Sequence, residues 1–285
     1  MNTYFRIIKK ASERIKKYYP DKEENAIKIL VMELSGFDGA NFIIHMNDEV
    51  PTDKYKIIND AVNEYLEKGR PIQHILGYSY FYGYKIKVNP DVLIPRPETE
   101  ELVAEVLQTY DEVFPNQKVD VVDIGTGSGA IAISLSKEEA NFTVKASDLS
   151  CEAVEVAKEN AKSLDANVEF FVGDMLNPFI ERNLKFDILV SNPPYICDEE
   201  YVEDIVKDNE PHMALFGGKD GLYFYDVILS NASKILNEKN IIAFEHSYSK
   251  GKEMLELAHK YFPNGDAKIY KDLNGKDRIM IIINK

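Results

Sequence analysis

The stretch that decides the fold is Phe186-Asp187-Ile188-Leu189-Val190-Ser191-Asn192-Pro193-Pro194-Tyr195-Ile196, an apolar run that two prolines stop. The residues before Asn192 are typical of a buried β-strand. Pro193 and Pro194 lack a backbone N–H and have a fixed φ, and a residue that precedes a proline is held in an extended conformation. The strand therefore has to end at Asn192, and a rigid turn follows.

This turn offers two oxygen acceptors at a fixed separation. The carboxamide oxygen of Asn192 and the carbonyl of Pro193 can each accept one hydrogen of a planar NH2 group, and the Tyr195 ring lies beside them. Asn-Pro-Pro on its own is an ordinary turn signal. Because the turn follows a buried strand and a glycine-rich loop precedes it, we expect an active site that comprises Asn192, Pro193, Pro194 and Tyr195.

Short apolar runs alternate with helical patterns on both sides of this strand. The predicted strands are residues 119–122, 144–146, 168–171, 186–191 and 241–245, and the predicted helices are residues 130–137, 151–162 and 222–236. Such alternation indicates an α/β fold with a parallel sheet and helices on both faces. Residues 267–271 and 278–283, which flank Asn274-Gly275, are predicted to close the sheet as an antiparallel pair.

A glycine-rich loop separates the first of these strands from its helix, at Asp123-Ile124-Gly125-Thr126-Gly127-Ser128-Gly129. Its glycines allow a tight turn and let a ligand approach the main chain and the helix N-terminus. The loop also satisfies a relaxed dinucleotide-binding pattern. Asp123, however, disfavours a pyrophosphate and favours a ligand with positive charge. S-adenosylmethionine is such a ligand, because it carries an ammonium and a sulfonium and no phosphate.

Two further acids fit that cofactor. Asp148 lies about as far beyond the glycines as a ribose-binding acid is expected, and Asp174 could accept from the adenine amino group while Met175 packs on the ring. The alternative functions are a helix cap for Asp148 and a turn for Asp174. The residues that we assign to cofactor binding are Asp123, Gly125, Thr126, Gly127, Gly129, Asp148, Leu149, Asp174, Met175 and Asn192.

The chain divides into three predicted parts. Residues 1–77 show apolar positions at helical spacing and predict a helical domain that recognises the substrate. Residues 78–94 are rich in aromatic and β-branched residues around Asn89-Pro90-Asp91, which predicts a β-hairpin linker. Residues 95–285 form the predicted sheet domain. The tyrosines of the hairpin are interpreted as packing rather than as a platform for bases.

Composition limits the possible partners. A formal net charge of −14 argues against stable binding to nucleic acid, which requires a basic surface, and favours a protein partner. Neither a membrane span nor a signal-peptide core is evident, so we expect a soluble, cytoplasmic protein without a membrane partner. The two cysteines are too few for a disulfide framework, and the five histidines lack the spacing of metal ligands.

The combined motifs resemble a known family. Gly125-Thr126-Gly127-Ser128-Gly129 with Asn192-Pro193-Pro194-Tyr195 is similar to amino-group methyltransferases that use S-adenosylmethionine. Further segments resemble the protein-(glutamine-N5) methyltransferases of peptide chain release factors, namely residues 71–77, 92–100, 210–215, 217–222 and 272–278. One departure is Tyr80, where the family usually has an acid. The likeness covers residues 71–285, and the first 70 residues fit as a helical domain of suitable size.

The resemblance implies a Rossmann-like class I methyltransferase sheet and a specific reaction. The methyl group of S-adenosylmethionine would pass to the glutamine amide nitrogen of the Gly-Gly-Gln motif in a release factor, giving S-adenosylhomocysteine. Asn192 and Pro193 would accept the two amide hydrogens, and Pro194 and Tyr195 would complete the substrate pocket. From the residues themselves, we also expect Arg96 to support the pocket by pairing with a carboxylate, and Phe81 to contact the incoming glutamine loop.

Three alternatives remain open from the sequence. An amino-group methyltransferase of adenine or guanine in DNA or RNA would use the same turn, but it should carry a basic groove. A nicotinamide oxidoreductase would use the glycine loop but leave residues 192–195 without a role. A binding module without activity would not need the glycines, the acids and the turn together.

Overall fold

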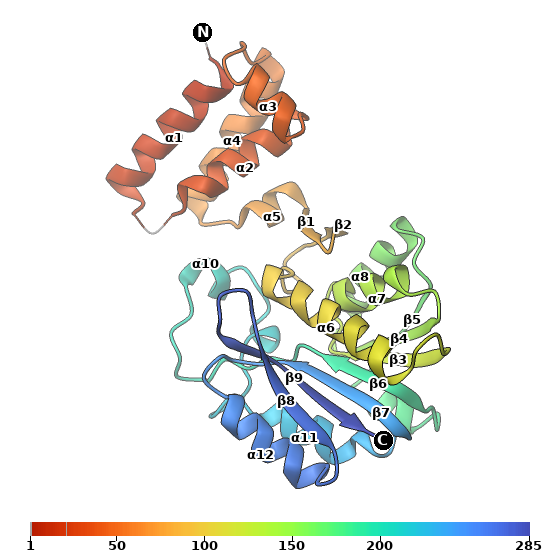
Figure 1. Cartoon of the computed structure of the whole chain (residues 1–285). Coiled ribbons are helices and arrows are strands. Elements are labelled where there is room, and N and C mark those ends of the chain that lie inside the picture. The colour runs from red at the N-terminus through yellow and green to blue at the C-terminus, as the bar shows by residue number, and fades with distance from the viewer. Residues whose placement is uncertain (1, 21) are drawn as a thin grey trace. The chain divides into compact units, whose positions relative to one another are not determined.

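The computed structural model describes residues 2–20 and 22–285, which form two compact units. One unit comprises Met1–Tyr78 and Val202–Asn209, and the other comprises Ser79–Tyr201 and Glu210–Lys285. The segment that returns to the first unit begins a few residues after the Asn-Pro-Pro-Tyr turn. Figure 1 labels most of the elements of both units.

The first unit is helical. Its helices are α1 (Tyr4–Tyr18), α2 (Glu24–Ser35), α3 (Gly39–His45), α4 (Thr52–Lys68), α5 (Ile72–Leu76) and α10 (Asp204–Lys207). Ile27, Leu30 and Ile58 are fully buried at its centre, and Ile205 of α10 packs against this core. Asn209 Nδ2 also donates to the Gly69 carbonyl at 2.9 Å. The sequence pattern did not indicate α3, α5 and α10, because these helices are too short to show a period.

The second unit contains a seven-stranded sheet in the order β5-β4-β3-β6-β7-β9-β8. The first five are parallel, and β9 pairs antiparallel with β7 and β8. The bounds are β3 Val119–Ile124, β4 Phe142–Asp148, β5 Val168–Val172, β6 Phe186–Ser191, β7 Leu236–Glu245, β8 Asp266–Lys271 and β9 Asp277–Asn284. The predicted α/β sheet and its antiparallel closure are therefore confirmed.

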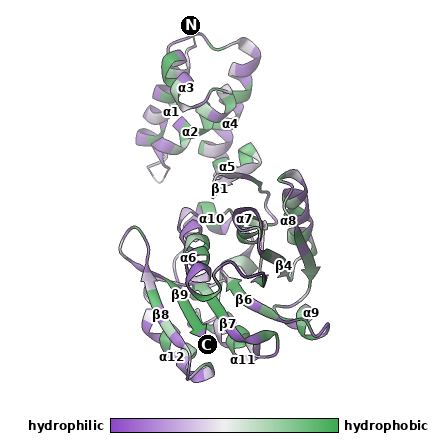
Figure 2. Cartoon of the chain, turned by 45° about the vertical axis from the view of Figure 1, so that its right-hand side comes forward, coloured by the Kyte–Doolittle hydropathy of each residue, from purple (hydrophilic) through white to green (hydrophobic). Residues whose placement is uncertain are grey.

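Helices cover both faces of this sheet because alternate strand residues point to opposite sides. Ile188 and Val190 join a core with α6 (Pro97–Val113), α7 (Ala130–Glu138) and α8 (Cys151–Ser163). Leu189 joins a second core with α9 (Asn177–Ile180), α11 (Tyr223–Ala232) and α12 (Gly251–Tyr261). Strands β6, β7 and β9 are correspondingly hydrophobic in Figure 2. Their continuous apolar character is what a strand buried on both faces requires.

The structure corrects two predicted boundaries. The hairpin of β1 (Tyr78–Phe81) and β2 (Tyr84–Lys87) turns at Tyr82 and Gly83, not at residues 89–91. Both turn residues have positive φ, 50° and 80°, as a two-residue hairpin turn of type I′ requires. The helix predicted for residues 222–236 ends at Ala232. The Ser230 hydroxyl and the Asn231 carboxamide both donate to the Val227 carbonyl, and these side-chain hydrogen bonds compete with the backbone hydrogen bonds of the last turn.

The parallel strands bring their carboxyl ends to one edge of the sheet. The strand order reverses between β3 and β6, and ligands of open α/β sheets bind at such a switch point. The glycine loop follows β3, Asp148 ends β4, Asn192 follows β6 and Glu245 ends β7. Among the described residues, no helix is both long enough and apolar enough to cross a bilayer.

Candidate active site

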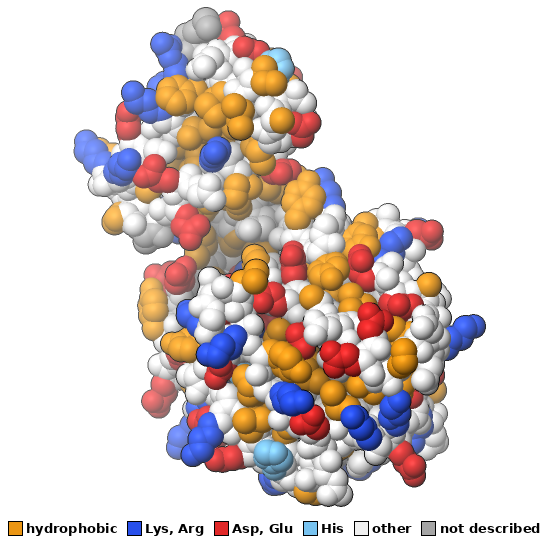
Figure 3. Space-filling view, in the orientation of Figure 1, with side chains coloured by type: hydrophobic (Ala, Val, Ile, Leu, Met, Phe, Trp, Pro, Cys, Tyr) orange, Lys and Arg blue, Asp and Glu red, His pale blue; other side chains and the backbone are white. Residues whose placement is uncertain are grey.

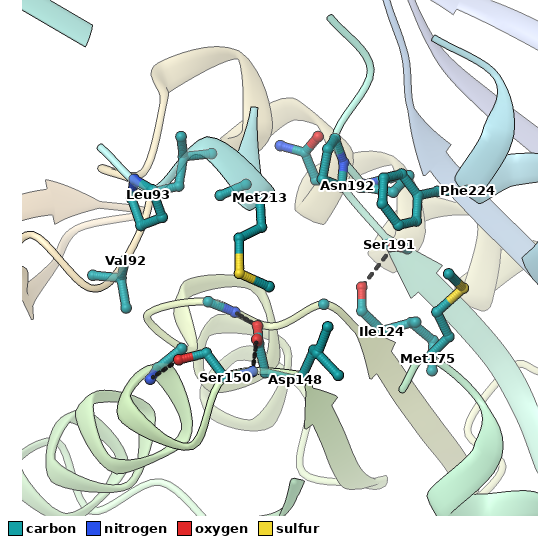
Figure 4. A pocket seen from close by; sticks show the side chains of 18 of the residues that line it. Val92, Leu93, Ile124, Asp148, Ser150, Met175, Ser191, Asn192, Met213 and Phe224 are labelled. Atoms are coloured by element: carbon teal, nitrogen blue, oxygen red, sulfur yellow. Dashed lines mark hydrogen bonds between the residues drawn. The ribbon is translucent and has the colours of Figure 1, made fainter. Parts of the chain in front are cut away.

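A cavity of about 300 Å³ lies at the switch point. It brings together many of the residues selected from the sequence, namely Gly125, Gly127, Asp148, Leu149, Asp174, Met175, Asn192, Pro193 and Pro194. Figure 4 shows Asp148 and Asn192 on opposite sides of the space, with Met213 between them in this view. One side of the cavity therefore carries a carboxylate and the other a carboxamide.

The Asp148 carboxylate holds the glycine loop. Its Oδ2 accepts from the Gly127 N–H at 2.8 Å, and its Oδ1 accepts from the Ser150 N–H at 3.0 Å. The cap of α8 is Ser150, whose hydroxyl accepts from the Ala153 N–H, so the alternative assignment of Asp148 as the helix cap is wrong. Burial raises the pKa of Asp148, and the backbone hydrogen bonds from Ser150 and Gly127 oppose that rise.

Asp174 and Met175 lie in a turn after β5. The Asp174 side chain is exposed, and its carbonyl accepts from the Asn177 N–H. Met175 has a φ of 46°, and its carbonyl accepts from the Ser147 hydroxyl at 2.8 Å. Both residues line the cavity.

Three residues assigned to the cofactor, Asp123, Thr126 and Gly129, do not line the cavity. Asp123 is fully buried behind the loop, where its Oδ2 accepts from the Thr126 hydroxyl at 2.6 Å. Gly129 has a φ of +83°, and a side chain there would contact Ala157 and Ile133 at 3.0 Å. These three residues shape the loop from behind.

Asp123 is a strongly perturbed acid. Burial raises its pKa to about 7, the nearby Asp148 charge adds to the rise, and the Thr126 hydroxyl opposes it. The folded protein therefore holds a proton that the unfolded chain releases near pH 4. Its stability falls as pH rises from about 4 towards 7, and the penalty is complete above pH 7.

Asp123→Asn should remove this pH dependence. Relative to the native protein, we expect the variant to gain roughly 2 kcal/mol of unfolding free energy between pH 5 and pH 8. Urea unfolding at both pH values measures this difference. Parallel stability profiles for the two proteins would contradict the assignment.

The Asn192 turn is fastened on two sides. Ser191 donates its hydroxyl to the Ile124 carbonyl at 2.6 Å, which joins the ends of β6 and β3. Asn192 Nδ2 donates to Thr99 Oγ1 at 3.2 Å. Tyr195 does not line the cavity, because its ring packs against the second core and its hydroxyl donates to Glu245 Oε1 at 3.2 Å. Burial, followed by the Glu245 charge, raises the pKa of Tyr195 well above its usual range.

Two glycines of the segment 217–221 support this turn from behind. A Cβ on Gly217 would lie 2.4 Å from the Pro194 carbonyl oxygen, and one on Gly221 would lie 2.3 Å from the Tyr195 carbonyl oxygen. The Gly217 N–H also donates to the Ile196 carbonyl at 2.8 Å. Two backbone segments are in direct contact here, and only glycine, which has no side chain, allows them to approach so closely.

Arg96 has the carboxylate partner that we expected. Its guanidinium lies 2.6 Å from Glu210 Oε1, and the buried Glu210 also accepts from the Ile94 N–H at 2.9 Å. Pro211, the next residue, lines the cavity. Arg96 does not line the cavity itself, so it supports the wall through Glu210.

Phe81 does not occupy the expected position. Its ring is fully buried in the first core, so the side chain is closed to an incoming loop. The apolar wall of the cavity comes instead from residues that the sequence reasoning had not selected, namely Val92, Leu93, Met213 and Phe224. Thr99 and Glu245 were also not selected, although Glu245 ends a predicted strand at the functional edge of the sheet.

Comparison with known proteins identifies both parts of the chain. The model of the Methyltransferase small domain matches residues 100–215, and that of the PrmC N-terminal domain matches residues 6–77. The release factor glutamine methyltransferase of Bacillus subtilis is 41% identical over 289 residues, which cover 100% of this chain and 99% of that protein. Its namesake in Bacillus cereus is 41% identical over 261 residues, 91% of this chain and 92% of that protein.

Solved structures support the fold. A methyltransferase from Pyrococcus furiosus superimposes with a TM-score of 0.51 at 20% identity, covering 82% of this chain and 99% of that one. That likeness concerns the fold alone, whereas the sequence relatives extend over nearly the whole chain. The protein therefore belongs to the release factor glutamine methyltransferase family.

Proposed function

We propose that the protein methylates the side-chain amide nitrogen of the glutamine in the Gly-Gly-Gln motif of peptide chain release factors. S-adenosylmethionine is the methyl donor, and S-adenosylhomocysteine is the product. The observation that carries the proposal is the Asn192 carboxamide, which lies at the carboxyl end of β6 in the same cavity as Asp148. The names of the relatives support this substrate.

The cavity suits this cofactor. Gly125 and Gly127 have positive φ and open space where a side chain would stand, so a ligand can approach the main chain. Asp148 can accept from the ribose hydroxyls, and Asp174 can accept from the adenine amino group. Leu149, which is 55% exposed, and Met175 supply apolar contacts beside them.

The reaction needs a positioned nitrogen more than a base. The cofactor supplies an electrophilic methyl group, so that the N–C bond forms as the C–S bond breaks and the amide then loses one proton to solvent. An amide nitrogen is a poor nucleophile because its lone pair is delocalised. Asn192 Oδ1 and the Pro193 carbonyl accept its two hydrogens, orient it and stabilise the positive charge that develops on it.

The other residues of the turn act on its shape. Pro194 lines the cavity and restricts the backbone, and Tyr195 fixes the end of the turn through Glu245. Tyr195 therefore supports the substrate pocket from behind rather than forming its wall. Leu93 and Met213 line the cavity, and we assign them to contact with the glutamine stem.

Asp148→Ala should weaken cofactor binding. We expect the dissociation constant for S-adenosylmethionine to rise by about 10- to 100-fold, because hydrogen bonds to a charged group are lost and the Gly127 N–H loses its acceptor. Isothermal titration calorimetry measures the change. Asp111→Ala, an exposed acid at the end of α6, is the matched control and should bind normally. Unchanged affinity in Asp148→Ala would contradict the assignment.

The helical unit is proposed to recognise the release factor. Residues 78–94 are assigned as the linker and residues 95–285 as the catalytic part, and the two matched family models, over residues 6–77 and 100–215, lie on either side of that linker. A release factor acts on the ribosome, so we place the enzyme in the cytoplasm. A protein substrate offers enough surface for a separate recognition unit.

Amino-group methylation of DNA or RNA is the second candidate, because the same turn could hold an adenine or guanine amino group. On the face of the molecule in Figure 3, acidic and basic side chains are interspersed. The net charge of −14 also disfavours a nucleic-acid partner. Incubation with labelled S-adenosylmethionine and, separately, release factor, duplex DNA and RNA decides between the substrates. Label on the release factor supports the proposal, and label on nucleic acid alone overturns it.

A further inference from the structure

The orientation of the Asn192 carboxamide decides whether the turn can hold a substrate amide. The group has an oxygen acceptor on one side and an NH2 donor on the other, with nearly the same shape. If the NH2 faced the substrate, two N–H donors would oppose each other. Catalysis as proposed above therefore requires a contact that selects one of the two orientations.

Glu245 supplies the fixed end of such a contact. It ends β7 with only 1% of its surface exposed, and its carboxylate accepts from the Tyr195 hydroxyl at 3.2 Å. Burial raises the pKa of Glu245, and the Thr99 hydroxyl and the charge of Arg278 oppose that rise. The other carboxylate oxygen, Glu245 Oε2, is buried and has no hydrogen-bond partner among the described residues.

Thr99 connects Glu245 to Asn192. It lies in the first turn of α6, is 5% exposed, and has a single hydroxyl hydrogen. If that hydrogen is donated to Glu245 Oε2, the buried acceptor that lacks a donor, Thr99 Oγ1 can only accept from its other neighbour. That neighbour is Asn192, whose Nδ2 lies 3.2 Å from Thr99 Oγ1.

We propose that Glu245 and Thr99 form a polar relay that orients Asn192, so that Oδ1 faces the substrate amide. They are positioning residues, because neither lines the cavity. The proposal rests on the function proposed above and adds two residues to its machinery. Helix capping does not explain the buried Thr99 hydroxyl, because the N-cap of α6 is Arg96 and Thr99 Oγ1 accepts from Asn192 Nδ2.

Thr99→Val tests the relay because it keeps the shape and removes the hydroxyl. We expect kcat for a release factor to fall about tenfold or more, as for a lost hydrogen bond of about 1.4 kcal/mol. The KM for the release factor and the affinity for S-adenosylmethionine should change less than about twofold, because the relay sets only the orientation of one group. Thr99→Ser, which restores the hydroxyl, should recover most of kcat.

Glu245→Gln tests the other end. Its new NH2 can donate to Thr99 Oγ1, which frees the Thr99 hydrogen to donate to Asn192 Oδ1 and turns the carboxamide over. We expect a similar loss of kcat, and the double variant with Thr99→Val should lose no more than the worse single variant. Full kcat in folded Thr99→Val, or no recovery in Thr99→Ser, overturns the relay.

A second readout separates the relay from the proposed reaction. The side-chain NH2 signals of Asn192 in a ¹⁵N-labelled protein can be assigned by their loss in Asn192→Ala. One of the two hydrogens should be protected from exchange in the native protein and in Thr99→Ser, and unprotected in Thr99→Val. Equal exchange in all three proteins overturns the relay. Protection in a protein that leaves the release factor unmethylated overturns the proposed function alone.

Discussion

Asn192→Ala is expected to reduce turnover of the release factor by ~10²-fold or more, the loss typical of removing one preorganised polar group. The variant lacks the Oδ1 acceptor but keeps the Pro193 carbonyl. A substrate amide can therefore still enter, but its nitrogen is not oriented towards the methyl group. Affinity for S-adenosylmethionine should remain within a few-fold of the native value, because the cofactor is assigned chiefly to the Asp148 side of the cavity.

Single-turnover methylation and calorimetry measure these two effects separately. Asn167→Ala is a matched control, since this asparagine is exposed and its carbonyl, not its side chain, accepts from Ser136. It should leave both quantities unchanged. If Asn192→Ala retained native turnover, the two-acceptor mechanism would be wrong.

Gly217→Ala should be comparably damaging although Gly217 does not line the cavity. Its new methyl group would lie 2.4 Å from the Pro194 carbonyl oxygen and 2.9 Å from Tyr195 Cα, so the turn has to shift. A displacement of about 1 Å in a reacting group can cost ~10²-fold in rate. We therefore expect turnover to fall about that far.

Circular dichroism and calorimetry distinguish a displaced turn from an unfolded protein. Cofactor binding should survive in Gly217→Ala, because the glycine loop follows β3 and Asp148 ends β4, away from the altered turn after β6. Gly39→Ala is the matched control, since a side chain there meets open space. A folded Gly217→Ala protein with native turnover would show that the backbone contact does not position the turn.

The sequence predicted the sheet domain well because its central strands, such as β3 and β6, are buried on both faces. Continuous apolar runs such as residues 186–191 resist other assignments, and two prolines fix where that strand ends. The parallel arrangement then places every strand end at one edge. The sequence therefore predicts that the glycine loop, Asp148 and Asn192 meet at this edge of the sheet.

The features that the sequence did not predict depend either on competition between neighbouring turn signals or on contacts between residues far apart in the chain. Asn89-Pro90-Asp91 is a stronger turn signal than Tyr82-Gly83, so the sequence predicts the hairpin turn too far along the chain. The contact of Thr99 with Asn192 joins residues 93 positions apart, and no local pattern reports it. Phe81 is predicted from the sequence to contact the glutamine loop, yet its side chain is fully buried in the core.

A crystal structure with S-adenosylhomocysteine and a glutamine-containing peptide from a release factor tests the central claim most directly. We predict that the glutamine side-chain nitrogen lies within hydrogen-bonding distance of both Asn192 Oδ1 and the Pro193 carbonyl and faces the cofactor sulfur. A carboxamide of Asn192 turned away from the glutamine, with the nitrogen held by other groups, would contradict it.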